Sequence, residues 1–132
     1  MDILKRKDLY GANLQGANFQ GADLIEANLE KANLIGTNLM GANLQGANFK
    51  EANLEGAHLE GANLEGANLE GANLKGANLI EAHLEGTHLE GAKNLSFNQL
   101  SKVKTLYATI LDEELLIPLK EKYAPLLEKP DK

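Results

Sequence analysis

The 132-residue sequence contains no cysteine and no tryptophan, and only 5% of its residues are aromatic. Without cysteine, the chain can form neither disulfide bonds nor thiolate metal sites. It also lacks an apolar run near the roughly 18 residues that a membrane-spanning helix needs. The start of the chain is basic, but no apolar stretch typical of a secretory signal follows it. We therefore expect a cytoplasmic protein.

Positive charge is also scarce. Lysine and arginine number 13 against 19 aspartates and glutamates, which gives a net charge of -6 and an isoelectric point near 5.0. Direct binding to nucleic acid or to an anionic membrane needs a surplus of basic side chains, so the composition predicts neither. The length is that of a single domain.

A five-residue repeat dominates what remains. Sixteen consecutive units, of which GANLE is typical, run from Gly11 to Glu90 without an insertion. The second position is alanine in fourteen units, the third is asparagine in twelve, and the fourth is leucine in fourteen and phenylalanine in two. All thirteen glycines of the protein hold the first position, counting Gly91. Such regularity means that the repeat determines the fold.

A period of five excludes the two common regular elements. On an α-helix five residues advance by about 500°, so the leucines would cover every side of the cylinder. In a long strand, successive leucines would alternate between the two faces because five is odd. A short extended piece followed by a bend avoids both problems, with alanine and leucine pointing inward, asparagine outward, and glycine at the corner. Repetition of this unit coils the chain into a narrow solenoid.

The tandem motif A-[N/D]-L-x-G, unbroken over residues 11–90, resembles the pentapeptide-repeat family. The resemblance implies an all-β solenoid, namely a right-handed quadrilateral β-helix with four units and twenty residues per coil. Here it would comprise about four full coils plus a partial coil, with the leucine or phenylalanine of each unit in the core and a short C-terminal α-helical cap. The family is abundant in cyanobacteria, so the resemblance also points to a cyanobacterial origin.

The charged residues allow a check of the four-sided geometry. With twenty residues per coil, Lys31 lies over Glu51, Lys50 lies between two glutamates, and Lys75 lies over Glu55. A three-sided coil of fifteen residues per turn would pair Lys50 and Lys75 but leave Lys31 without a carboxylate. The charges therefore favour four sides, although exposed pairs contribute only about 0–1 kcal/mol each.

The chain divides into three segments. Residues 1–10 are a lead-in or partial coil, residues 11–91 form the β-helix, and residues 92–132 hold a short helix, a partial coil, a capping helix and a polar tail. Because Leu4 and Leu9 keep the spacing of five, the lead-in continues the repeat, yet it is too short to cover the first coil. We therefore hypothesise end-to-end homodimerisation through the N-terminal coil.

Several signals organise the C-terminal segment. The spacing of Ser96 and Gln99 is that of a capping box and predicts a short helix over about residues 97–103. The stretch LYATIL restores the spacing of five and predicts a final partial coil. Asp112 is placed to cap a helix that begins EELL, and Pro118 should kink or divide that helix. The region 113–127 resembles the capping helix of the family.

The three histidines raise the possibility of a metal site. In a four-sided coil, however, His58, His83 and His88 occupy three different sides, each at the outward position normally held by asparagine. They cannot converge on one ion without distortion of the coil. The sequence thus predicts no metal site and no cofactor.

Negative charge is concentrated in the second half of the repeat. Residues 51–90 carry eight glutamates against one lysine, whereas residues 1–50 are neutral overall. Two pairs of glutamates stack as like charges in the four-sided coil, and they define the candidate interaction surface: Glu65, Glu70, Glu85 and Glu90. Some pentapeptide-repeat proteins are acidic mimics of DNA that inhibit DNA gyrase, a type II topoisomerase. Those mimics are generally longer and present a continuous charged rod, whereas the glutamates here fall on all four sides.

Signals for catalysis are absent. Serine occurs only at Ser96 and Ser101, and the glycines are corner residues with no phosphate-binding motif among them. A filled solenoid also offers no cavity in which a substrate could be desolvated. We predict a non-enzymatic structural or protein–protein interaction module with an unknown protein partner, and the alternative is an acidic DNA-mimic inhibitor of DNA gyrase.

Overall fold

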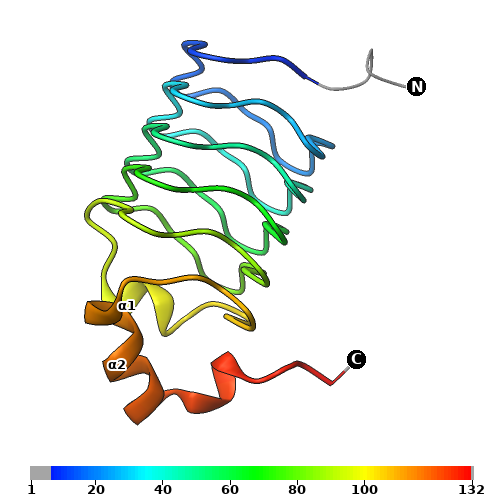
Figure 1. The fold of residues 1–132 in the computed structure, drawn as a ribbon. Helices are drawn as coiled ribbons and strands as arrows, with labels where there is room; N and C mark the ends of the chain where they lie inside the picture. The colour runs from blue at the N-terminus through cyan, green and yellow to red at the C-terminus, as the bar shows by residue number, and fades with distance from the viewer. Residues whose placement is uncertain (1–6, 132) are drawn as a thin grey trace.

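The computed structural model describes residues 7–131, which form a stack of four-sided coils with helices at the C-terminal end (Figure 1). Parallel bridges join residues twenty positions apart, beginning with Asp8 to Asn28 and continuing to Asn73 with Lys93. Each coil therefore contains twenty residues and four units, which confirms the four-sided geometry. We number the sides by the units of the first full coil: 11–15, 16–20, 21–25 and 26–30.

Each side is held to the next coil by backbone hydrogen bonds around a single central residue. The Leu54 N–H donates to the Asn73 carbonyl over 2.8 Å, and the Asn53 N–H donates to the Ala32 carbonyl over 3.0 Å. The described residues contain isolated bridges of this kind and no longer strands. This follows from the repeat, because a turn interrupts the extended backbone in every unit.

The corners explain the glycines. The Ala72 N–H donates to the Leu69 carbonyl across the turn, and Gly71 between them has a φ of +68°. Side chains disfavour this left-handed region, whereas glycine enters it freely. Four units nevertheless place another residue there, with φ between 58° and 61°: Glu26, Lys31, Glu51 and Glu81.

The core consists of the fourth-position side chains stacked in columns. From Leu24 to Leu89 these side chains are at most 3% exposed, and Phe49 is fully buried among them. The alanines of the second position fill the spaces between the columns. In the first coil, Leu9, Leu14 and Phe19 are only partly buried. The prediction that leucine and alanine point inward is confirmed.

The asparagine side chains lie on the outside and accept the N–H of the fifth residue of their own unit, and two of them also donate to the asparagine of the preceding coil. Asn73 Oδ1 accepts the Lys75 N–H over 3.1 Å, and Asn73 Nδ2 donates to Asn53 Oδ1 of the preceding coil over 3.2 Å. One side chain thus braces the turn of its own unit and contacts the coil before it. These two bonds explain the preference for asparagine over other polar residues at the third position.

The short helix α1 (Phe97–Leu100) replaces the extended backbone on the second side of the last coil. The predicted capping box is confirmed, since the Gln99 N–H donates to Ser96 Oγ and Ser96 N–H donates to Gln99 Oε1. The helix is shorter than the predicted span of 97–103. Gln99 Nε2 also donates to the carbonyls of Leu74 and Ala77 at 2.8 and 2.9 Å. A side-chain amide thus replaces the backbone donors of a further coil.

The stretch LYATIL then runs along two sides of the stack. Thr105 bridges to His83 and Ile110 to His88, so α1 has lengthened the coil from twenty to twenty-two residues. Leu106 is fully buried in the core column, and Leu111 is 9% exposed.

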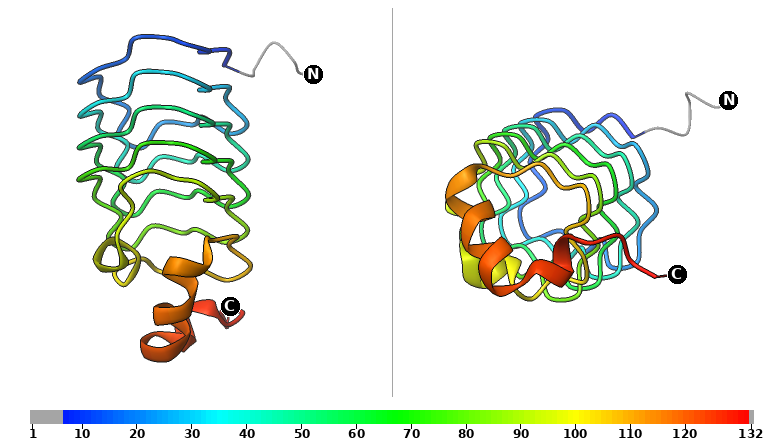
Figure 2. Two further views of the ribbon diagram at one scale, coloured as in Figure 1. Left: turned by 60° about the vertical axis from the view of Figure 1, so that its left-hand side comes forward. Right: turned by 60° about the horizontal axis from the view of Figure 1, so that its bottom comes forward.

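The chain ends in α2 (Glu113–Lys122) and the 3-10 helix η2 (Ala124–Leu127), which lie beside the last coil (Figure 2). Leu119 of α2 is fully buried, and the Leu106 N–H donates to the Leu126 carbonyl over 2.7 Å. The Phe97 and Tyr123 rings pack with their centroids 5.4 Å apart, which joins α1 to the end of α2.

Two expectations about α2 require correction. Asp112 stands at the N-cap position, but its side chain does not cap the helix. Its carboxylate instead accepts the Gly91 N–H over 3.1 Å, because this N–H has lost the carbonyl that a complete coil would supply. Pro118 lies inside α2 and does not divide it. Leu4, which was expected to continue the repeat, falls outside the described residues. No helix within the described residues is long and apolar enough to cross a membrane.

Candidate functional site

The four glutamates of the candidate interaction surface lie on two adjacent sides of the coil. Glu65 and Glu85 belong to stacked units on the third side, and Glu70 and Glu90 to stacked units on the fourth. Glu65 is exposed, and the other three are partly buried. The Ala67 N–H donates to the Leu64 carbonyl and the Ala72 N–H to the Leu69 carbonyl, so Glu65 and Glu70 lie in two successive turns. One pair therefore stands at each end of the fourth side.

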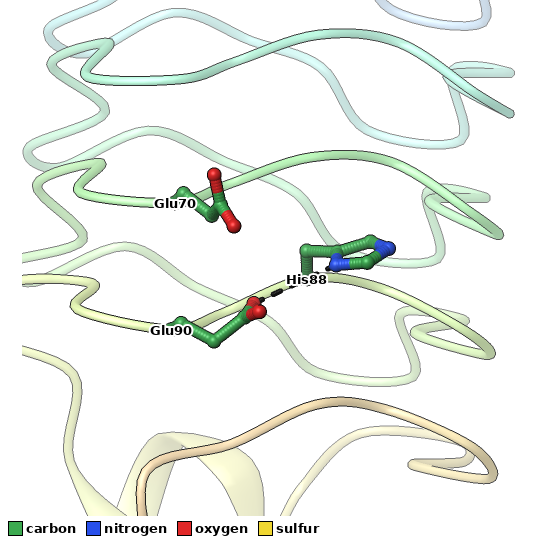
Figure 3. Close-up of side chains that lie close together, drawn as sticks. All are labelled: Glu70, His88 and Glu90. Atoms are coloured by element: carbon green, nitrogen blue, oxygen red, sulfur yellow. Dashed lines mark ion pairs between the residues drawn. The ribbon is translucent and has the colours of Figure 1, made fainter.

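On the fourth side a histidine joins the glutamate pair. Glu70, His88 and Glu90 each offer a ligand atom, and these atoms lie within 4.8 Å of one another (Figure 3). His88 Nδ1 is 3.6 Å from Glu90 Oε1. The arrangement follows from the coil, because Glu70 occupies the same place as Glu90 one turn earlier and His88 precedes Glu90 by two residues along the same side.

Glu90 Oε1 is shielded from solvent and has no hydrogen-bond partner among the described residues. The 3.6 Å separation from His88 Nδ1 allows an electrostatic attraction but is longer than a hydrogen bond. His58 and Glu60 repeat this pairing on the second side at 3.4 Å, and Glu60 Oε1 is likewise shielded and unpartnered. There, Met40 occupies the place of a second glutamate, one coil before Glu60.

The third side has the same spacing of residues but a different arrangement. Glu65, His83 and Glu85 match the fourth-side positions in sequence, yet they do not form a cluster of this kind in the described structure. His83 and Glu85 instead line an open hollow of about 530 Å³ together with Lys104 and Lys129. Asp131 lines the same hollow, so residues of both charges surround His83 and Glu85 on this side.

The expectation that the three histidines lie apart is confirmed, since they bridge to residues of three different sides. That reasoning compared histidines only with one another. The meeting of one histidine with two glutamates corresponds to a different pattern, the spacing E-x17-H-x-E in residues 70–90. In a coil of twenty residues this spacing puts three potential ligands on one side.

Only one of the predicted lysine pairs reaches ion-pair distance within the described residues. Lys31 Nζ is 3.8 Å from Glu51 Oε1, and both side chains are about half exposed. Tyr10 beside Lys31 contributes most to raising the pKa of that lysine above its ordinary value, and Glu51 contributes after it. Lys50 and Lys75 lie on the predicted sides without such a contact.

Comparison with known proteins now bears on this geometry. The family model described as pentapeptide repeats matches the chain in eight copies, with matched segments at residues 8–46, 37–76, 57–93 and 67–103. The chain belongs to the pentapeptide-repeat family. Members of this family form right-handed quadrilateral β-helices and are generally non-enzymatic structural modules. A search of curated proteins finds no match.

Solved structures of pentapeptide-repeat proteins resemble the chain. Rfr23 from the cyanobacterium Cyanothece 51142 is 45% identical with a TM-score of 0.65, and the match covers 80% of this chain. The chain spans 64% of the length of Rfr23. The protein alr5209 from Nostoc PCC 7120 is 32% identical with a TM-score of 0.44, over 83% of this chain and 88% of that one.

QnrB1, a plasmid-mediated fluoroquinolone resistance protein, also matches, over 97% of this chain and 76% of its own. Its identity is 21% and its TM-score 0.39. At this level the likeness carries no argument about what the present pentapeptide-repeat protein binds.

Proposed function

We propose that this pentapeptide-repeat protein is a non-enzymatic interaction module that presents the sides of its coil to a protein partner in the cytoplasm. The observation that supports the proposal is that different positions of each unit face the interior and the solvent. The second and fourth positions fill the interior, whereas the fifth position varies between units and points outward. Variation confined to the outside is suited to recognition, because it changes the surface without disturbing the core.

Within this surface we assign the contact to the fourth side and the two corners that bound it. Glu65 and Glu85 stack at the corner between the third and fourth sides, and Glu70 and Glu90 stack at the corner between the fourth and first sides. Stacked carboxylates repel one another in the free protein, and a basic partner surface would offset this repulsion with opposite charge. The partner is therefore a protein with a basic patch, and it is bound without catalysis.

Replacement of the four glutamates tests the assignment. A variant with Glu→Gln at all four positions should retain the native-host partner at least about tenfold less in an affinity capture, since paired rim and core charges each change affinity severalfold. The matched control changes the same amount of charge in the C-terminal segment, at four exposed glutamates: Glu113, Glu114, Glu121 and Glu128. Equal loss in both variants, or no loss in either, would contradict the assignment.

An assay of DNA gyrase supercoiling addresses the alternative function. Inhibition at micromolar protein that disappears in the variant lacking the four glutamates would replace the interaction module with a DNA-mimicking gyrase inhibitor. We expect no inhibition, because the acidic side chains of the second half are distributed over all four sides. A DNA mimic needs a continuous charged face that runs along the rod.

We also propose roles for the two ends. Side chains and carbonyls outside the repeat satisfy edge groups of the last coil, which supports a capping function for the segment that contains α1, α2 and η2. At the other end, partial exposure of Leu9, Leu14 and Phe19 supports homodimerisation through the first coil. Light scattering that shows a monomer at high protein concentration would dispose of the homodimer.

A further inference from the structure

We propose that Glu70, His88 and Glu90 form a binding site for a divalent transition-metal ion, of which Zn²⁺ is the model. The three side chains project from two successive coils of the fourth side and face one another (Figure 3). Their positions are determined by a β-helix whose backbone bonds hold successive coils together, so the site is largely preformed. The inference does not depend on the proposed protein partner.

The distances suit a small ion. Zn²⁺ binds imidazole nitrogen and carboxylate oxygen at about 2.0–2.2 Å, which places neighbouring tetrahedral ligand atoms about 3.3 Å apart. His88 Nδ1 and Glu90 Oε1 are already 3.6 Å apart, and no pair in the cluster exceeds 4.8 Å. Rotation of the glutamate side chains would bring their carboxylate oxygens into contact with the ion without movement of the backbone.

The donor types select the class of ion. Mg²⁺ and Ca²⁺ prefer oxygen ligands throughout, whereas imidazole together with carboxylate suits Zn²⁺ and its neighbours in the first transition row. Two carboxylates supply the two negative charges that a divalent cation needs. Three protein ligands leave a fourth position for water or for a donor from another molecule.

A second observation concerns the free carboxylate oxygen. Glu90 Oε1 is shielded from water and has no hydrogen-bond donor in residues 7–131, and Glu70 of the preceding coil adds a like charge beside it. Burial of an unpaired carboxylate oxygen is unfavourable, and a cation between the two glutamates would relieve both the desolvation and the repulsion. Neither the core nor the backbone ladder requires this arrangement.

The other two histidines provide internal controls. His58 pairs with Glu60 but meets Met40 in place of a second glutamate, so that side offers two ligands. His83 has both glutamates in sequence, but these three side chains form no such cluster among the described residues. They lie instead by an open hollow lined by residues of both charges. The structure thus predicts one site and not three.

Calorimetric titration of Zn²⁺ into untagged, chelator-treated protein tests the proposal. We expect one equivalent to bind to the native chain and binding to be weakened at least about tenfold by His88→Asn, since one ligand of three is lost. Asparagine holds this position in twelve units, so the coil should be preserved, and an unchanged melting temperature of the metal-free variant verifies this. His58→Asn and His83→Asn should bind Zn²⁺ like the native chain.

Further measurements separate a coordination site from an acidic surface. Glu70→Gln should weaken Zn²⁺ binding as His88→Asn does, and Co²⁺ should give visible absorption bands of low-coordinate cobalt that both variants lose. Mg²⁺ at the same concentration should not compete. Equal weakening by His83→Asn, competition by Mg²⁺, or no binding of Zn²⁺ to the native chain would each overturn the proposal.

Discussion

The repeat body and the C-terminal segment satisfy the backbone hydrogen-bonding groups at the edge of a coil in different ways. In the body, each coil satisfies the backbone of its neighbour with identical bonds, such as Leu54 N–H to the Asn73 carbonyl. In the C-terminal segment, single residues do this work, namely the Gln99 amide, the Asp112 carboxylate and the Leu126 carbonyl. The repeat body therefore uses the same backbone bonds in every coil, whereas the end of the stack depends on individual side chains.

Truncation of a core leucine should have the largest effect and should be greater in the body. Leu64→Ala removes a 1% exposed side chain that packs against coils on both sides, and we expect the free energy of unfolding to fall by about 3–4 kcal/mol. Leu119→Ala in α2 should lower it by about 2–3 kcal/mol, because fewer layers surround it. Urea denaturation followed by circular dichroism measures both. A larger loss for Leu119→Ala would reverse the ranking of the two regions.

Loss of Gln99 should come next and would show that termination depends on one side chain. Gln99→Ala leaves the Ala77 carbonyl and the Ser96 N–H without partners, at a cost of about 2 kcal/mol in the free energy of unfolding. The neighbouring Asn98 is exposed, and Asn98→Ala should change stability by less than about 0.5 kcal/mol. Equal effects of the two variants in urea denaturation would remove Gln99 from this role.

The corners should show a rule that both regions share. Glu81 in the body and Ala108 in the C-terminal segment have left-handed backbones, with φ of 61° and 60°. Glu81→Gly and Ala108→Gly relieve this strain, so each should stabilise the protein by about 1 kcal/mol and raise its melting temperature. Gly66→Ala should lower stability by a similar amount. A Cβ at Gly66 would meet nothing within 4 Å, so its effect reports backbone strain alone. Destabilisation by both glycine variants would contradict the rule.

The smallest effect should come from the exposed ion pair of the body. Lys31→Gln should leave the midpoint of urea denaturation unchanged at neutral pH, because half-exposed charges are screened. Because the pKa of Lys31 is raised, the contribution of the pair, which is too small to shift the midpoint, is present below the ordinary pKa of 10.5 and is lost as pH rises through the higher folded-state pKa. A measurable difference between the two proteins at pH 7 would show that the pair stabilises the coil after all.

The sequence predicted the body well because every unit repeats the same physical requirement. Leucine at a period of five cannot lie on one face of a helix or a strand, so the extended piece and the glycine corner follow from it. The C-terminal segment was only partly predictable. The spacing of Ser96 and Gln99 predicted their capping box. Nothing in the sequence indicated that the Asp112 carboxylate would accept the Gly91 N–H rather than cap α2. That contact depends on which edge group the last coil leaves free.

The candidate site shows the same limit. Stacking of Glu70 on Glu90 follows from the coil length alone. Its meeting with His88 depends on side-chain conformations, since the third side has equal spacing but no such cluster among the described residues. Periodicity predicts which residues are neighbours, whereas the local environment determines whether they meet.

Coils of constant length give the printed sequence an unusual property. When the repeat is written in lines of twenty letters, residues above and below one another on the page are adjacent on the molecule, separated by about 4.8 Å. Any chosen group of side chains can therefore be composed as a pattern of rows and columns, and its position on the surface is known before a structure is determined. For protein engineering, a binding motif can therefore be placed on the coil surface by choosing the residues at given sequence positions.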